Sequence, residues 1–218
     1  MMKLLLVSDT VVYYGYSIGK CSFKMSFTLP SHRATPPPAQ KFSLRSPLPV
    51  KQSSVWKIEA GAVRTLTWLE DGTTITTGIW GPGDIVGRVL STVDPYQIEC
   101  LTVVDAIPVV VDQANLPVEW FLTHMQHTET LMMIRSYRRV DTMLVKLLGW
   151  LGQRFGQSVE SGKLIDLRLT HQDLAELLGT TRVTVTRILG QFEDQGLIER
   201  LSLHRIVLKE YEDWHYEI

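Results

Sequence analysis

The segment from Leu169 to Leu208 constrains the fold of this chain more than any other part of its sequence. Thr170 precedes a short amphipathic run and Asp173 follows in the position of a capping box, which predicts the start of a helix. Gly179 ends this run, because glycine accepts the left-handed backbone angles of a helix C-terminus. A second amphipathic run extends from Thr181 to about Gln195. Two short helices around a tight glycine-containing turn predict a helix-turn-helix.

The residues after the second helix predict a winged form of this motif. Gly196 stops the helix, and Leu197–Leu201 and Arg205–Leu208 have the pattern of the two strands of a wing. We therefore expect a winged helix-turn-helix domain over residues 139–218, opened by a further helix at Val140–Phe155.

The outward side of the second helix carries residue types that bind DNA. We predict base contacts from four of them: Arg182, Val183, Thr186 and Arg187. Arginine can donate two hydrogen bonds to guanine O6 and N7, whereas valine offers only an apolar contact, for instance to a thymine methyl. Thr181 and Thr184 are expected to bond phosphates at the positive end of the helix dipole. The alternative is an ordinary helical hairpin whose Arg and Thr side chains are merely solvated.

From Trp56 onward the sequence is typical of an antiparallel β domain. Runs rich in β-branched and aromatic residues alternate with glycine-containing turns, at Val55–Ile58, Ala62–Trp68, Thr73–Ile79 and Leu101–Val111. Asp71-Gly72 between two of these runs is the strongest hairpin signal. Six of the ten prolines lie between Pro30 and Pro49, so we predict a disordered extension over residues 1–50 and the β domain over 51–114.

A long helix is expected next, within residues 115–138. From Val118 to Tyr137 there is neither Gly nor Pro, and Asn115 before Pro117 is a suitable capping residue. Four apolar residues form a stripe that suits a dimer interface: Val118, Leu122, Met125 and Met132. The alternative is a helix that packs only on its own β domain.

Composition argues against several other classes of protein. The 218 residues carry a formal net charge of -1, so any nucleic-acid contact must come from local clusters of Lys and Arg. Cys21 and Cys100 lie far apart and the histidines lack zinc-binding spacing, so we expect no metal and no cofactor. The sequence has neither the residue order of a catalytic triad nor a phosphate-binding glycine loop, so we do not expect an enzyme. No apolar run is long enough to span a bilayer, so we expect a cytoplasmic protein without a membrane partner.

Five segments resemble the Crp/Fnr family of bacterial transcription regulators: Thr181–Arg187, Ile165–Gln172, Ile58–Val63, Glu70–Gly72 and Gly81–Gly87. Thr181–Arg187 and Ile165–Gln172 are most similar to the cyanobacterial nitrogen regulators within this family. The resemblance extends from about Trp56 to Lys209. It implies an α+β fold with an N-terminal antiparallel β-roll of the cyclic-nucleotide-binding kind, a long dimerisation helix and a C-terminal winged helix-turn-helix. The proline-rich stretch matches the family's first strands poorly, which leaves a truncated roll as an alternative.

The resemblance also implies partners and residue roles. It implies a homodimer that binds a palindromic site in double-stranded DNA and contacts RNA polymerase. Arg182 and Arg187 match the family's base-reading arginines, and Val183 replaces the acidic residue of the cyclic-AMP members. Contacts to the DNA backbone fall at the start of the first helix of the motif, on Thr170, His171 and Gln172.

The effector pocket of the family is the part that this sequence matches least. Cyclic-nucleotide binders place a Glu and an Arg-Ser pair where this chain has neither, and Pro95 stands at an arginine position of the nitrogen regulators. The remaining candidates for an effector pocket are Arg88, Val89, His124 and Glu129. We therefore keep, as one alternative to a regulator that binds a specific DNA sequence, a ligand-gated sensor of a metabolite that is not a cyclic nucleotide. A second alternative is a protein-interaction module that has lost DNA binding.

Overall fold

The computed structural model describes residues 4–7, 10–13, 25–28, 37–111 and 116–209. The chain divides into two compact units, Met1–Pro36 and Pro37–Ile218. In the first unit, β1 (Leu4–Val7), β2 (Thr10–Tyr13) and β3 (Met25–Thr28) pair as an antiparallel sheet. These strands differ from the disordered extension that the sequence predicted. They precede the proline-rich stretch and consist largely of the β-branched, aromatic and other apolar residues that favour strands.

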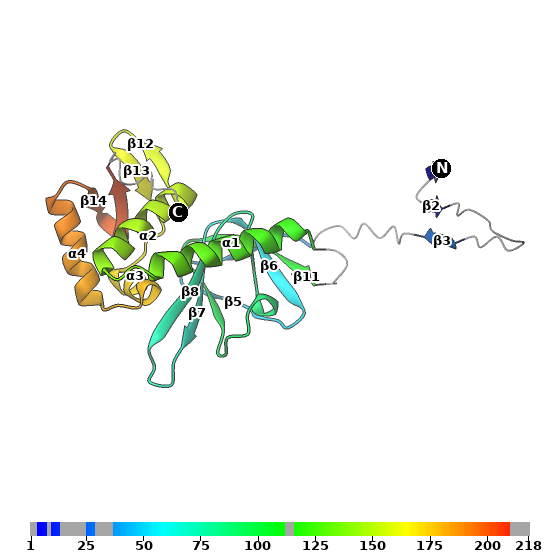
Figure 1. Cartoon of the computed structure of the whole chain (residues 1–218), viewed down its shortest axis with the longest axis horizontal. Helices are drawn as coiled ribbons and strands as arrows, with labels where there is room; N and C mark the ends of the chain where they lie inside the picture. The colour runs from blue at the N-terminus through cyan, green and yellow to red at the C-terminus, as the bar shows by residue number, and fades with distance from the viewer. Residues whose placement is uncertain (1–3, 8–9, 14–24, 29–36, 112–115, 210–218) are drawn as a thin grey trace, which may run out of the picture. The chain divides into compact units, whose positions relative to one another are not determined.

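A β-roll of two four-stranded antiparallel sheets opens the second unit (Figure 1). One sheet has the strand order β5-β10-β7-β8, and the other has the order β4-β11-β6-β9. The strands are β4 (Gln40–Phe42), β5 (Pro47–Leu48), β6 (Ser54–Ala60), β7 (Val63–Trp68), β8 (Thr74–Trp80), β9 (Ile85–Val86), β10 (Gln97–Cys100) and β11 (Val104–Val110), with a 3-10 turn η1 at Arg88–Leu90. The predicted hairpin is confirmed, because Gly72 adopts a φ of 83° in the turn between β7 and β8.

The roll begins before the boundary predicted at residue 51. β4 pairs with β11, and β5 pairs with β10 through Leu48 and Ile98. Pro47 is compatible with this strand because β5 lies at the edge of its sheet, where a missing N–H breaks no ladder hydrogen bond. The proline-rich composition of this stretch therefore concealed two edge strands.

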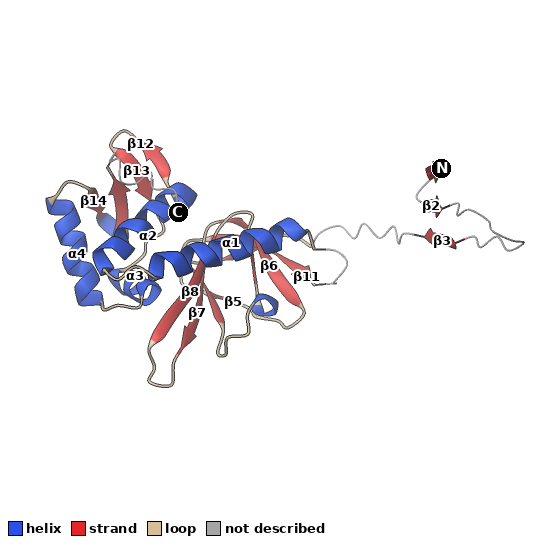
Figure 2. Cartoon of the chain, viewed as in Figure 1, coloured by secondary structure: helices blue, strands red, loops and turns tan. Residues whose placement is uncertain are grey.

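Two helices connect the roll to the C-terminal domain (Figure 2). α1 (Val118–Arg135) begins directly after Pro117 and packs against β8, and α2 (Val140–Phe155) follows it. The expected capping residue Asn115 lies outside the described residues. One apolar cluster runs from Ile79 of the roll through Ile134 of α1 to Leu147 of α2. None of the described helices is both long enough and apolar enough to cross a membrane.

The C-terminal domain is a winged helix-turn-helix, as the sequence predicted. Its strands form a sheet of order β12-β13-β15-β14, beside which α2, α3 and α4 share one core. The elements are β12 (Gln157–Val159), β13 (Gly162–Ile165), α3 (His171–Leu178), α4 (Arg182–Asp194), β14 (Ile198–Leu201), a short turn η2 (Ser202–His204) and β15 (Arg205–Leu208). α3 also packs against β8, so the first helix of the motif touches the roll directly.

Candidate DNA-binding surface

Both helices of the motif are capped, and the caps of α3 are those that the sequence predicted. Thr170 Oγ1 accepts a hydrogen bond from the backbone N–H of Asp173 at 3.1 Å, and the Asp173 carboxylate accepts one from the N–H of Thr170 at 2.7 Å. This reciprocal pair is a complete capping box. Gly179 ends α3 at φ 67° and ψ 40°, the left-handed conformation that glycine adopts without strain. At the start of α4, the hydroxyl of Thr181 accepts a hydrogen bond from the N–H of Thr184.

The four predicted base-reading residues all lie on the solvent-exposed side of α4: Arg182, Val183, Thr186 and Arg187. The opposite side of the helix is buried through Val185, Ile188 and Leu189. Val183 is 78% exposed, and an apolar side chain so accessible near a helix N-terminus is available for an apolar contact with a partner. The first turn of α4 contains no acidic residue, so nothing there repels a phosphate backbone.

The guanidinium groups on this surface have no carboxylate partner among the residues that the structure describes. The guanidinium of Arg182 has no hydrogen-bonded or ion-paired partner within that part of the chain, and Arg187 donates only to the amide oxygen of Gln191, at 3.3 Å. Both arginines therefore keep donors available for an acceptor outside the protein. This is the state that bidentate recognition of a base edge requires.

The start of α3 is tied to the middle of α4 by a side-chain hydrogen bond. His171 Nδ1 lies 2.7 Å from Thr186 Oγ1, and that hydroxyl donates to the carbonyl of Arg182 at 2.8 Å. The hydroxyl proton is committed to a carbonyl, so Nδ1 is the donor and the Nε2 atom of His171 is left without the ring proton. Burial, followed by the nearby charges of Arg200, His204 and Arg182, lowers the pKa of His171 below its ordinary value.

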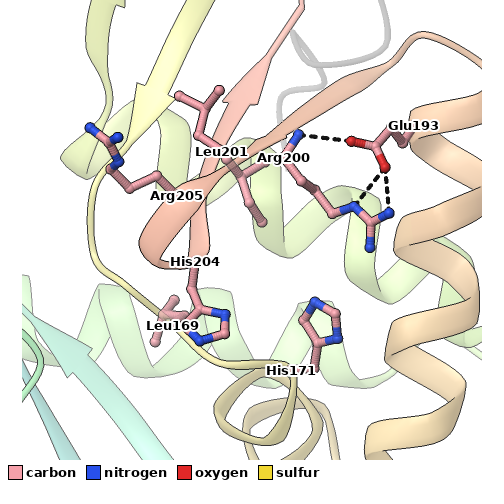
Figure 3. Close-up of a pocket in the computed structure, with 8 residues that line it drawn as sticks. Leu169, His171, Glu193, Arg200, Leu201, His204 and Arg205 are labelled. Carbon is pink, nitrogen blue, oxygen red and sulfur yellow. Dashed lines mark hydrogen bonds and ion pairs between the residues drawn. The ribbon is translucent and has the colours of Figure 1, made fainter.

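A hollow with a cavity volume of about 450 Å³ separates α3 and α4 from the wing (Figure 3). Its wall combines cationic, imidazole and apolar side chains with one carboxylate: Leu169, His171, Glu193, Arg200, Leu201, His204, Arg205 and Ile206. Figure 3 shows His171 and His204 facing each other across the hollow, and their ring centroids are 6.4 Å apart. Arg200 is held by the carboxylate of Glu193, whereas Arg205 donates to the carbonyl of Ser202 at 3.2 Å within the wing.

The wing residues were not among the predicted site residues. Leu203 and His204 form the tip of the wing in the left-handed region, with φ of 62° and 58°. Residues other than glycine adopt these angles at a cost in free energy, and such strained residues are common at functional sites. The short interruption between the two strand-like runs was the only signal in the sequence, and it did not identify which side chains face α3.

The residues expected in an effector pocket have separate contacts. Arg88 pairs with Asp94 at 3.5 Å, within its own loop. His124 instead stacks on Trp80 with ring centroids 4.1 Å apart, and burial lowers its pKa. Val89 and Glu129 are exposed. The role of all four residues in effector binding stays a prediction.

The stripe predicted on α1 is exposed to solvent. Val118, Leu122, Met125 and Met132 are 65%, 51%, 66% and 63% exposed. They lie opposite to Leu131 and Ile134, which α1 buries against its own chain. Glu129 lies between Met125 and Met132 on the same stripe, at the spacing of four and three residues that keeps side chains on one seam.

Sequence comparisons place this architecture among known regulators. The Crp-like helix-turn-helix domain matches residues 139–213. The regulatory protein CysR of Synechococcus elongatus is 46% identical over 182 residues, which cover 82% of this chain and 88% of that relative. The global nitrogen regulator of Synechocystis sp. is 28% identical over 174 residues, which cover 70% of this chain and 77% of that protein.

Solved structures of other regulators have a similar fold. A transcriptional regulator of the CRP family from Thermus thermophilus has a TM-score of 0.67 at 18% identity, over 80% of this chain and 94% of that one. FixK2 from Bradyrhizobium japonicum has a TM-score of 0.66 at 22% identity, over 81% and 96%. At these identities the likeness shows the fold, whereas the relative at 46% identity shows the family. With its β-roll, its capped helix-turn-helix and this relative along most of its length, the chain belongs to the Crp/Fnr family of transcription regulators.

Proposed function

We propose that this chain binds a palindromic DNA element as a homodimer and reads guanines in each half-site with Arg182 and Arg187. The observation that carries the proposal is the exposed face of α4, where both guanidinium groups lack a carboxylate partner among the described residues. The N-terminal half of the second helix of this motif is the part that enters the major groove. Val183 then meets a thymine methyl, and Thr186 lies beside it.

Phosphate contacts are proposed for the residues that surround this helix. Thr181 and Thr184 lie at the N-terminus of α4, where backbone N–H groups and the helix dipole favour an anion. Thr170, His171 and Gln172 lie at the N-terminus of α3, which crosses the DNA backbone in such complexes. These contacts position the protein without reading sequence.

The homodimer is proposed from the stripe on α1. An exposed row of Val118, Leu122, Met125 and Met132 costs free energy in water, and a second copy of the same helix covers it in a two-fold arrangement. The resulting pair of recognition helices reads two half-sites about one helical turn apart. RNA polymerase is the proposed protein partner at a promoter.

Selection from a randomised duplex library at fixed physiological salt tests the DNA specificity. We expect enrichment of an inverted repeat with guanine in each half-site, and salt is fixed because phosphate contacts alone give strong binding at low ionic strength. Enrichment that requires added cell metabolites indicates a ligand-gated sensor. No enrichment in either condition contradicts sequence-specific binding and favours an interaction module.

Charge in the stripe tests the dimer. Met125→Glu together with Met132→Glu is expected to give monomers that bind the palindrome weakly, because each helix then adds two carboxylates to that of Glu129 and these face their copies across the seam. Gln126→Glu is the matched control, since it adds a negative charge at an exposed position outside the stripe. Light scattering measures the oligomeric state, and a stable dimer in the double variant rejects this interface.

A further inference from the structure

Five charged side chains meet where the roll touches the helix-turn-helix. Two arginines and one carboxylate come from the roll, and two carboxylates come from α3: Arg45, Arg64, Glu99, Asp173 and Glu176. We call this set the roll–α3 ion network. Four of its members are largely buried, and the fifth, Arg45, has a side-chain exposure of 34%. Removing a charged side chain from water costs free energy, so buried charges occur only where specific partners hold them.

Arg64 is the centre of the network. Its guanidinium lies 3.1 Å from the Glu99 carboxylate, 2.8 Å from that of Asp173 and 2.9 Å from that of Glu176. Its side chain is only 8% exposed. One arginine on β7 is thereby fixed to β10 within the roll and to two successive turns of α3 outside it.

Arg45 holds α3 from the loop between β4 and β5. Its guanidinium lies 2.9 Å from Glu99 and 2.6 Å from Asp173, and it donates to the carbonyl of Arg168 at 3.4 Å. Its own backbone is fixed at a φ of 63° by a hydrogen bond from its N–H to the carbonyl of Cys100. A left-handed arginine with three partners is held in one conformation.

The network continues to the residues proposed to contact the DNA backbone. Glu176 accepts a hydrogen bond from Gln172 Nε2 at 3.0 Å, and Asp173 accepts one from the N–H of Thr170. The same two carboxylates therefore bind the roll on one side and the phosphate-facing end of α3 on the other. Because α3 and α4 share a core and the His171–Thr186 hydrogen bond, a fixed α3 also fixes α4.

We propose that Arg45 and Arg64 are positioning residues for DNA binding, which set the angle of the helix-turn-helix to the roll through Asp173 and Glu176. The inference rests on the proposed function, since it concerns the placement of two recognition helices in one dimer. Buried ion pairs add little net stability compared with apolar residues, but their directional geometry specifies one arrangement. A palindrome demands one arrangement, because both half-sites must be reached at once.

The test compares one palindromic duplex with a duplex that carries a single half-site. In Arg45→Met and Arg64→Met we expect affinity for the palindrome to fall at least about tenfold, because the second half-site is no longer reached at high effective concentration. Affinity for the single half-site is expected to stay within about twofold, since α4 itself is unchanged. Lys41→Met is the matched control, because it removes an exposed positive charge of the roll.

Arg45→Met keeps the test decisive if Arg64→Met lowers stability too far, because Arg45 is partly exposed and its loss leaves Arg64 in place. Equal losses on both duplexes, or no loss on either, overturn the positioning role. A wild-type protein that does not prefer the palindrome overturns the proposed function instead. Asp173→Glu keeps the charge and the capping ability, so we expect it to retain more affinity for the palindrome than Asp173→Asn. Equal affinities of these two variants for the palindrome contradict the proposal.

A second measurement needs no DNA. Spin labels at Lys51→Cys in the roll and Gln195→Cys after α4, in a Cys21→Ser background and diluted with unlabelled chain, report the distance between the two domains. Both labelled positions are exposed. We expect one narrow distance distribution in the wild type and a broadened one in Arg45→Met. An unchanged distribution shows that the roll–α3 ion network only stabilises the fold.

Discussion

The arginines on α4 and those in the roll–α3 ion network belong to one residue type but face opposite conditions. Arg182 and Arg187 are exposed and have no carboxylate within the described chain, whereas Arg64 is buried among Glu99 and two acidic residues of α3. A solvated guanidinium loses little on leaving water for a base edge, because new hydrogen bonds replace those with water. A guanidinium already desolvated and paired has nothing left to offer a ligand.

The carboxylates decide which role an arginine takes. In the network, burial by itself raises the pKa of Asp173, but the hydrogen bond from Arg45 and the charge of Arg64 outweigh it and hold that pKa below its ordinary value. Asp173 therefore stays ionised and keeps both arginines occupied. On α4 the first turn is free of acidic residues, so its arginines stay available. Charge placement, and not arginine content, therefore decides whether a guanidinium is paired within the chain or stays available to a partner.

The largest expected effect is the loss of stability when the buried Arg64 is replaced. Arg64→Met leaves Asp173 and Glu176 without their shared cation, and removal of one partner from a buried ion pair costs about 3–5 kcal/mol in the free energy of unfolding. Urea denaturation measures this loss. Arg182→Met is the contrasting variant, and we expect its unfolding free energy to stay within about 0.5 kcal/mol of wild type. Similar losses in the two variants contradict the division of roles.

Replacement of the exposed Arg182 is expected to weaken DNA binding instead. Arg182→Ala is expected to lose about 1–3 kcal/mol of discrimination for guanine at each half-site, because a bidentate contact disappears. Fluorescence anisotropy at fixed salt, with the cognate duplex and one substituted at the guanine, measures this loss. The dimer is expected to persist, and Lys41→Ala controls for the removed positive charge. Unchanged affinity for the cognate palindrome rejects Arg182 as a base reader.

A smaller effect is expected at Thr170, whose backbone N–H donates to the network residue Asp173. Thr170→Ala removes one half of the capping box but leaves the arginine contacts of Asp173, so we expect a loss of about 1 kcal/mol in the free energy of unfolding. Thr181→Ala removes the cap of α4 and is expected to cost a similar amount. A loss in Thr170→Ala as large as that in Arg64→Met shows that capping, and not the ion pairs, holds α3.

The smallest effect is a pH dependence of DNA affinity. The pKa of His171 is lowered in the free protein by burial and then by neighbouring cations, so most of the protein has a neutral imidazole at neutral pH. A nearby phosphate favours the protonated form and raises this pKa in the complex. Affinity is therefore expected to rise as pH falls through the window between the pKa of the complex and the lower pKa of the free protein.

Binding titrations with the palindrome from about pH 8 to about pH 5.5 measure this dependence. His171→Gln is expected to flatten it, while His204→Gln separates the contribution of the second imidazole that lines the hollow. A slope that is unchanged in both variants excludes proton uptake at this hollow.

Local features of the chain could be predicted from its sequence more fully than the start of the roll and the wing. The capping box at Thr170, the left-handed Gly179 and the hairpin at Gly72 follow from residues three positions apart or fewer, and the structure confirms all three. The roll starts earlier than the sequence predicted, because an edge strand such as β5 tolerates the prolines that favoured a disordered stretch. The wing residues Arg205 and His204 were missed, because their direction depends on how the wing folds back toward α3.

The order of the helices and strands of the DNA-binding domain, and the chemistry of the exposed face of α4, could be predicted from local sequence alone. These follow from helical periodicity and from caps whose partners are close neighbours along the chain. The part of Arg64 in the roll–α3 contact became visible only in the folded chain, because its partner Glu176 lies 112 positions away. The sequence does not show which distant residue pairs with a charged side chain. Whether an arginine is solvated or paired depends on which side chains surround it once the chain has folded and water is excluded.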